Sequence, residues 1–230
     1  MTGRLIALRG AALVLGLAAC APRVAAPVGM PAADPAPLAA SIARATAPTQ
    51  PQQISFGWTL NEQGSRVSGK GVVRADAPDR IRLDLFGARN ETYLSAALVG
   101  EDFRFPGGAP QGVPLPSPAL LWGALGVVRP PASAELIDAT TDDSVTVIRY
   151  RATAGDIFQY RVYTSGSTPR LTQLERVRGT SVIESVRLDR SPTGVLSRAR
   201  YRDWSAYRDL TLEVENAKDV ASFPDEIWRP

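Results

Sequence analysis

The single cysteine of this 230-residue chain, Cys20, is the side chain whose chemistry its surroundings indicate most clearly. Leu17-Ala18-Ala19 stands directly before it, and the apolar run that begins at Ala11 follows a short segment holding two arginines. A charged start, a short apolar stretch and small residues before the cleavage point are typical of a secretory signal that is too short to span a bilayer as a mature helix. We therefore expect residues 1–19 to be a lipoprotein signal peptide and the Cys20 thiol to be acylated.

Acylation of Cys20 predicts where the mature chain would lie. One acyl chain gives only marginal membrane binding, whereas the three chains of a bacterial lipoprotein anchor firmly, at about 0.8 kcal/mol per buried CH₂. Ala21 follows the cysteine, and by resemblance to lipoprotein sorting in Gram-negative bacteria the absence of Asp there favours the outer membrane. We expect a lipid-anchored protein of the outer membrane that faces the periplasm. The alternative is an ordinary secreted protein with an incidental cysteine.

The sequence contains no histidine, and acylation of Cys20 would leave no free thiol. Histidine is the side chain that most often performs acid–base chemistry near neutral pH and most often binds transition metals. A Ser/His/Asp hydrolase and a His/Cys zinc site are thereby excluded. We expect no catalytic residue, no metal and no cofactor.

Carboxylate chemistry, for instance on glycans, is the enzymatic alternative. Its candidates, Asp142 and Asp143, are adjacent in a predicted turn, so their side chains point to opposite sides and are poorly placed as an acid/base pair. Lys70 could bind a head group or act as a base beside a serine, and an exposed strand lysine is the alternative.

The charge balance argues against a nucleic-acid partner. The 26 basic side chains exceed the 23 acidic ones by three, and two of the basic ones lie in the expected signal peptide. The mature chain is then nearly neutral, whereas nucleic-acid binding needs a clustered basic surface. One cysteine also allows no intramolecular disulfide, so packing must supply the stability.

The composition divides the remaining chain in two. Residues 20–52 are dominated by Ala and Pro, which bury too little apolar surface to offset the entropy of ordering, so we expect a tether. Within it, residues 38–46 could form a short helix with Leu38 and Ile42 on one face, or could be a mobile spacer. Residues 53–230 are expected to form a single domain.

The sequence pattern of that domain is typical of antiparallel strands. Runs rich in β-branched and aromatic residues alternate with Gly, Asn, Asp and Pro, and in Arg80–Phe86 apolar and polar residues alternate with a period of two. Short turns predict a meander, and one wet face predicts strong curvature. The expected fold class is mainly β, a single strongly curved antiparallel sheet, that is, an open or half β-barrel of about eleven strands, with one to three short helices as a lid. The predicted strands are 53–60, 66–74, 80–86, 92–98, 101–105, 135–139, 144–152, 157–164, 170–178, 181–190, 195–204 and 208–216.

One segment interrupts the strands. From Ser117 to Gly126 the sequence predicts a short helix, with Ser117 as N-cap, Pro118 at the first position and the glycine as terminator. Its apolar side, which carries Leu121, Trp122 and Leu125, must be covered by the sheet. The helix is therefore expected to act as a lid or plug.

Several segments, taken in order, resemble the periplasmic lipoprotein carriers and outer-membrane receptors LolA and LolB, most closely the receptor LolB. They are the lipobox ending at Cys20, Ser-Gly-Lys-Gly-Val-Val at 68–73, Asp-Arg-Ile-Arg-Leu-Asp-Leu-Phe-Gly at 79–87, the apolar segment 116–126 and Phe-Pro-Asp-Glu-Ile-Trp at 223–228. The likeness covers most of residues 53–230. It implies a half-barrel that binds acyl chains of lipoproteins or of phospholipid without a reaction, and a periplasmic carrier protein as a partner. One departure is Gly87–Asn90, which is polar where the receptors carry an exposed leucine.

The resemblance also implies which residues line the cavity and its lid: Trp58, Leu83, Leu85, Leu120, Leu121, Trp122 and Leu125. For the tryptophans, including Trp204 and Trp228, plain core packing is the alternative. Strand arginines are expected on the solvent face, although an inward arginine that contacts the lid fits the family; they include Arg82, Arg149, Arg151, Arg198, Arg200 and Arg202. A structural or lipid-sensing envelope lipoprotein with no transfer role remains the alternative function.

Overall fold

The computed structural model describes residues 21–107, 115–166 and 168–229. The expected signal peptide and Cys20 lie outside the described residues. No helix among those described is both long and apolar enough to cross a membrane.

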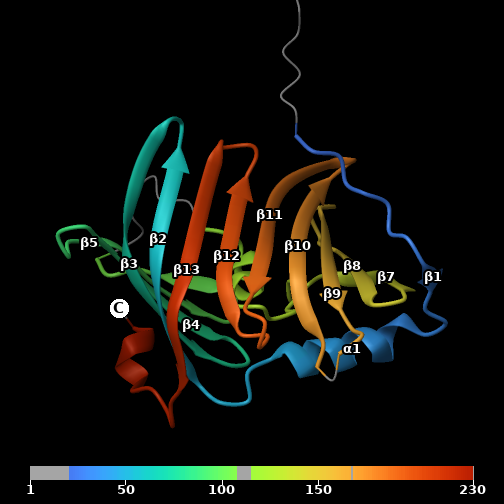
Figure 1. Cartoon of the computed structure of the whole chain (residues 1–230), viewed down its shortest axis with the longest axis horizontal. Coiled ribbons are helices and arrows are strands. Elements are labelled where there is room, and N and C mark those ends of the chain that lie inside the picture. The colour runs from blue at the N-terminus through green and yellow to red at the C-terminus, as the bar shows by residue number, and fades with distance from the viewer. Residues whose placement is uncertain (1–20, 108–114, 167, 230) are drawn as a thin grey trace, which may run out of the picture.

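The described residues form one antiparallel sheet of thirteen strands that does not close on itself (Figure 1). The predicted mainly β, half-barrel fold class is therefore confirmed. The strand order is β1-β7-β8-β9-β10-β11-β12-β13-β2-β3-β4-β5-β6. The strands are β1 (Met30–Pro31), β2 (Gln52–Glu62), β3 (Ser65–Asp76), β4 (Arg80–Gly87), β5 (Thr92–Val99), β6 (Asp102–Arg104), β7 (Glu135–Asp142), β8 (Val145–Arg151), β9 (Ile157–Tyr163), β10 (Arg170–Arg178), β11 (Ser181–Arg190), β12 (Leu196–Asp203) and β13 (Arg208–Asp219).

The order joins the two halves of the meander at a single seam. β13, the last strand of the chain, pairs along eleven registered positions with β2, the first long one. Because this pairing connects the ends of the domain, β7 to β13 and β2 to β6 form one continuous curved surface. Three short helices complete the described chain: α1 (Pro35–Thr46), α2 (Pro118–Ala124) and the 3-10 helix η1 (Asp225–Trp228).

β4 shows why the sheet has an apolar and a polar face. Ile81, Leu83 and Leu85 are buried in the core, whereas Asp84 on the other face accepts hydrogen bonds from Arg74 (2.8 Å) and Arg82 (2.9 Å). Alternation of this kind buries one face of an antiparallel strand and leaves the other to polar contacts. The apolar faces together form two core clusters, one on each half of the sheet.

The N-terminal segment differs from the expected tether. The Val24 amide donates to the Thr180 carbonyl (3.0 Å), the Val182 amide donates to the Pro22 carbonyl (2.9 Å), and β1 pairs with β7. α1 is the helical alternative for 38–46, extended at its start to Pro35. The physical reason is packing, because Ala39 and Ile42 are buried against the core of β7 to β12. The segment lies across the sheet as a strap (Figure 1).

Candidate functional site

An apolar cavity lies between α2 and the concave face of the sheet. Its volume is about 100 Å³. Residues from β2, β3, β4, β5, β12 and β13 contribute one wall and the segment around α2 contributes the other. The lining residues are Ile54, Phe56, Trp58, Leu60, Glu62, Val73, Leu83, Leu85, Tyr93, Leu94, Leu115, Pro116, Leu120, Leu121, Ala124, Leu125, Leu196, Ala199, Tyr201, Arg208, Leu210, Leu212 and Val214.

The seam between β13 and β2 supplies the centre of the sheet wall. Leu212 registers opposite Trp58, and Leu210 opposite Leu60. Residues that register across neighbouring strands point to the same face, so the period of two places both side-chain rows in the cavity. The Trp58 indole donates to the carbonyls of Lys70 (3.0 Å) and Phe86 (3.1 Å), which leaves its apolar ring surface facing the cavity.

α2 covers the cavity and also contacts β10, β11 and β12. It approaches the sheet closely at Gly123, where a Cβ atom would lie 2.7 Å from Leu174 Cδ2. Pro118 begins the helix as predicted, but the Ser117 side chain makes no capping hydrogen bond. Its Oγ is buried without a partner in the described chain, and the Ser117 carbonyl instead accepts from the Leu121 amide at 2.9 Å.

The structure brings six of the seven predicted cavity residues together: Trp58, Leu83, Leu85, Leu120, Leu121 and Leu125. Trp122 is the exception. Its side chain is buried and lines a separate cleft, and its ring centroid lies 5.3 Å from the Arg129 guanidinium carbon. Leu121 and Trp122 belong to the same core cluster, but successive residues of a helix point about 100° apart, and only Leu121 lines the cavity.

The two remaining tryptophans do not line the cavity. Trp204 follows β12 and packs beside the Arg202 guanidinium, whose carbon lies 5.2 Å from the ring centroid. Trp228 of η1 is buried against the outer face of β4 and β5. The Ile227 carbonyl of η1 accepts from Arg82 at 3.1 Å, so Arg82 holds the C-terminal helix and is not a free solvent-facing side chain.

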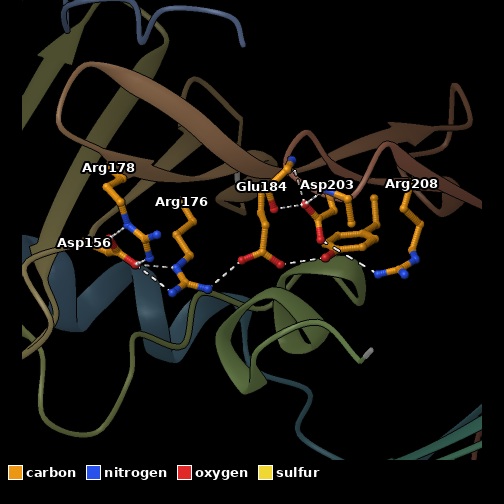
Figure 2. Close-up of polar contacts among 9 residues, drawn as sticks. Asp156, Arg176, Arg178, Glu184, Asp203 and Arg208 are labelled. Atoms are coloured by element: carbon orange, nitrogen blue, oxygen red, sulfur yellow. Dashed lines mark hydrogen bonds and ion pairs between the residues drawn. The ribbon is translucent and has the colours of Figure 1, made fainter. Parts of the chain in front are cut away.

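One end of the concave face carries a charged row that sequence reasoning missed. Five residues register across consecutive strands, in the order Arg176, Glu184, Asp203, Arg208 and Glu62. We call these five residues the ionic row; Figure 2 shows its first four members with Asp156 and Arg178. Charges of opposite sign occupy most neighbouring positions, so the side chains of the row largely neutralise one another's charges.

Individual contacts hold the ionic row together. Arg176 donates to Glu184 at 2.7 Å and forms an ion pair with Asp156 at 2.6 Å. The Tyr201 hydroxyl donates to Glu184 at 2.6 Å. Burial, with the negative charge of Glu184 beside it, raises the pKa of Tyr201, so the hydroxyl keeps its proton and remains a donor.

Arg208 is the member of the ionic row that reaches the apolar cavity. It pairs with Glu62, and both side chains line the cavity. Arg208, like Arg176, faces inward and is not among the strand arginines named from the sequence. The signal was present, because Arg208 is in phase with Leu210 and Leu212 and must point to the same face.

Among the described residues that line the cavity, Glu62 alone carries a carboxylate, so these residues do not form an acid/base pair there. Asp142 and Asp143 are exposed at the β7–β8 turn. The carboxylate of Asp203 accepts from Ser205 and from the Ala206 amide, and Glu184 is occupied by Arg176 and Tyr201. Lys70 is exposed on β3. In the described ranges, no three His, Cys, Asp or Glu side chains are grouped to hold a metal ion.

Comparison with known proteins places this architecture among solved structures. Neither protein-family models nor curated proteins yield a match to the sequence. A LolA superfamily protein from Nitrosomonas europaea aligns with a TM-score of 0.56, covering 86% of this chain and 99% of its own at 11% identity. An outer membrane lipoprotein-sorting protein domain from Vibrio parahaemolyticus aligns with a TM-score of 0.59, covering 84% and 95% at 8% identity.

A third structure, a DUF1329 family protein from Desulfovibrio piger, has a TM-score of 0.51, covers 85% of this chain and 98% of its own, and is 10% identical. At such identities the likeness concerns architecture alone. The three alignments extend over most of each chain with TM-scores above 0.5, which shows that this protein has a LolA-like fold.

Proposed function

We propose that the protein binds acyl chains, of lipoproteins or of phospholipid, in the apolar cavity beneath α2 and takes part in lipoprotein sorting at the cell envelope without catalysing a reaction. The observation that supports this most directly is the lining itself, in which nineteen of the twenty-three residues are neither charged nor tyrosine. A buried surface of this kind binds apolar groups and offers little to a polar substrate.

The size of the cavity requires α2 to move. At about 100 Å³ it is smaller than the apolar cavity of roughly 150 Å³ known to hold one benzene molecule. A long acyl chain therefore enters only as α2 is displaced from the concave face. We propose this displacement as the binding step, with α2 acting as the lid.

The energies of this exchange are comparable. Uncovering the three lid leucines, Leu120, Leu121 and Leu125, costs roughly 5–9 kcal/mol, at about 1.5–3 kcal/mol for each buried side chain. Burial of each methylene group returns about 0.8 kcal/mol, so about 6–11 methylene groups offset the loss. An acyl chain of ordinary length can thus replace the contacts of these three leucines without an external energy source.

The charged end gives the bound chain a direction. Arg208 and Glu62 pair at one end of the cavity, whose other polar lining residues are Tyr93 and Tyr201. The polar linkage of a lipid would lie beside this end, because burying it among leucines without hydrogen-bond partners costs several kcal/mol. The acyl tail would then extend toward Leu83 and Leu85.

The proposed location rests on the sequence and on the architecture. The lipobox predicts an acylated Cys20, and one solved relative in fold is described as an outer membrane lipoprotein-sorting protein domain. We propose that the chain is anchored through Cys20 to the outer membrane, faces the periplasm and receives its lipid from a periplasmic carrier protein.

A cavity-filling substitution tests the proposal. Leu212→Trp places a larger side chain at the centre of the cavity and should reduce binding of a fluorescent fatty acid at least tenfold, measured by titration on folded protein. Thr211→Trp is the matched control, because the neighbouring residue points to the other face of β13 and should leave binding unchanged.

The same measurement distinguishes the alternative in which the protein's own side chains fill the interior and the role is structural. In that case neither the unmodified chain nor Thr211→Trp would bind the fatty acid, and native mass spectrometry after mild purification would detect no bound lipid. Equal fatty-acid binding by Leu212→Trp and Thr211→Trp would show that the fatty acid does not bind in this cavity.

A further inference from the structure

A second cleft, of about 340 Å³, lies on the Trp122 side of α2. We call it the arginine cleft. It is formed where the end of α1, the start of β2, the end of α2, the start of β10 and the turn after β11 meet. None of its lining residues is acidic, and two are arginines: Ala45, Thr46, Pro48, Gln52, Ala75, Trp122, Leu125, Gly126, Val127, Thr168, Pro169, Arg170, Arg190 and Gly194.

Arg190 is held in this cleft with its hydrogen-bonding capacity largely unused. Its Nη1 donates to the Gly194 carbonyl at 3.2 Å, while its Nε is buried and has no partner in the part of the chain that the structure describes. Gly126, with φ +86°, makes room for it, because a Cβ there would lie 2.8 Å from Arg190 Nη2. The fold therefore leaves space for a guanidinium that no carboxylate of the described residues neutralises.

Arg170 lies against the same turn. A Cβ at Gly194, whose φ is +86°, would lie 2.6 Å from the Arg170 guanidinium carbon and both of its terminal nitrogens. One small residue thus contacts both arginines, through its carbonyl and through its Cα. Among the described residues neither arginine has a carboxylate within ion-pair distance, although most strand arginines of this protein do.

Two neighbouring positive charges without a counterion are electrostatically costly. Burial, together with the positive charge of Arg170, lowers the pKa of Arg190. Like charges repel more strongly where water is excluded. An anion between the two guanidinium groups would reverse this cost and would supply the acceptors that Arg190 lacks.

We propose that the arginine cleft is a binding site for a phosphate-type oxyanion, held by Arg170 and Arg190. Guanidinium groups bind such oxyanions through paired, charge-assisted hydrogen bonds, and a tetrahedral anion offers enough oxygen atoms for two arginines at once. Trp122 adds a buried indole N–H that has no acceptor in the described chain. The Gln52 amide and Thr46 line the same cleft.

The oxyanion has two sources of the same chemistry, a lipid headgroup and free phosphate. Leu125 lines both the arginine cleft and the apolar cavity, so a phospholipid bound in the cleft would have its acyl chains close to the lid. The oxyanion site itself does not depend on acyl-chain binding. Only its assignment to a lipid headgroup rests on the function proposed above.

The first experiment uses inorganic phosphate as the probe, titrated calorimetrically at constant ionic strength. Saturable binding is expected, and Arg170→Gln and Arg190→Gln should each weaken it by roughly tenfold or more, since each removes a charged hydrogen-bond donor. Arg151→Gln is the matched control, because Arg151 is an exposed strand arginine outside the cleft; it should bind phosphate as the unmodified chain does.

A second variant separates loss of binding from loss of fold. Arg190→Met removes the unneutralised charge but keeps the apolar stem, so in phosphate-free buffer its melting temperature should be no lower than that of the unmodified chain. Phosphate should then raise the melting temperature of the unmodified chain and leave that of Arg190→Met unchanged.

The source is assigned by comparing inorganic phosphate with dihexanoyl phosphatidylglycerol below its micelle concentration. Tighter binding of the lipid, lost on Leu212→Trp while phosphate binding persists, assigns a headgroup. Equal binding of both probes assigns free oxyanion. The site is overturned if phosphate does not bind saturably, or if Arg170→Gln and Arg190→Gln bind it like the unmodified chain, whatever the fatty-acid measurements show.

Discussion

At the scale of single residues, Asp156 shows how this sheet accommodates charge on its concave side. The residue is 2% exposed, and its carboxylate accepts from Arg178 Nε and Arg176 Nε, both at 2.8 Å (Figure 2). These hydrogen bonds, foremost that from Arg178, lower the pKa of Asp156 below its ordinary value of 3.8, although burial opposes the shift. The ionised carboxylate is therefore the form that the folded protein stabilises.

The direction of that shift predicts a pH dependence. A carboxyl with a lowered folded-state pKa contributes stability that is fully present above its unfolded value, 3.8, and is lost as the pH falls through the folded value. Asp156→Asn should cost about 2 kcal/mol of unfolding free energy at pH 7, because it weakens charged hydrogen bonds. It should also reduce the loss of stability on acidification below pH 3.8, measured by urea unfolding. Asp142→Asn, at an exposed turn, is the control, and an unchanged acid response in Asp156→Asn would contradict the assignment.

Much of the residue-scale site was predictable from periodicity alone. The uninterrupted alternation of residues 80–86 predicts that Leu83 and Leu85 lie on the apolar face of their strand, and both side chains line the cavity. Trp122 lies on α2 and lines the neighbouring cleft instead of the cavity, because apolar character on a seven-residue helix does not determine which of two adjoining spaces a side chain lines. The sequence prediction did not include Arg208, because a charged strand residue is ordinarily expected on the solvent face. The period of two that directs Leu210 inward nevertheless directs Arg208 inward as well.

At the scale of elements, α2 depends on a glycine for its approach to the sheet. Gly123 lies against Leu174 of β10, so an added methyl group meets a side-chain carbon at 2.7 Å. Alanine is the better helix former by about 1 kcal/mol, yet overpacking costs about 1–3 kcal/mol. The contact, and not the intrinsic propensity, should decide the effect of a substitution here.

A double-mutant cycle tests this contact. Gly123→Ala should lower the unfolding free energy and increase hydrogen exchange in α2, because the helix is pushed away from β10. Leu174→Val withdraws the atom that clashes, so the double variant should be more stable than the sum of the two single effects predicts, by about 0.5 kcal/mol or more. Additive effects would mean that Gly123 does not set the position of α2.

Turn residues in the sequence predict where strands begin and end, whereas the sequence does not predict which elements pack against each other. The predicted strands 170–178 and 181–190 coincide with β10 and β11 because Gly179 and Thr180 leave room for no other hairpin. α1 could not be separated from a mobile spacer, since the composition of an Ala/Pro segment does not reveal that Ile42 will find a core. β1 had no strand signal, being two residues long and containing proline.

At the scale of the whole molecule, an open sheet has two edges that must be protected. The described sheet ends in very short strands, β1 of two residues and β6 of three. Short edge strands offer few free backbone groups to another chain. Proline in β1 removes one of the donors that an additional strand would need.

Removal of residues 21–34, the part of the strap that precedes α1, should therefore cause self-association. In a form that begins at residue 35, the eight-residue β7 becomes the edge strand, and we expect concentration-dependent oligomers by size-exclusion chromatography with light scattering. Met30→Ala in the longer form that begins at residue 21 keeps the backbone pairing and should remain monomeric. A monomeric truncated form would show that the strap does not shield this edge.

The hydrogen bond from Val182 to Pro22 leaves only Ala21 between the sheet and the cysteine proposed to carry the lipid. If Cys20 is acylated as proposed, no flexible linker separates the domain from the bilayer, and the domain cannot reorient freely above it. The hairpin joining β10 to β11, which the strap reaches at Thr180, would rest on the headgroups. The β12–β13 and β2–β3 hairpins lie at the same end of the molecule (Figure 1). The Arg208 end of the cavity would then be oriented toward the membrane surface by the anchor itself, so docking and delivery would share one geometry.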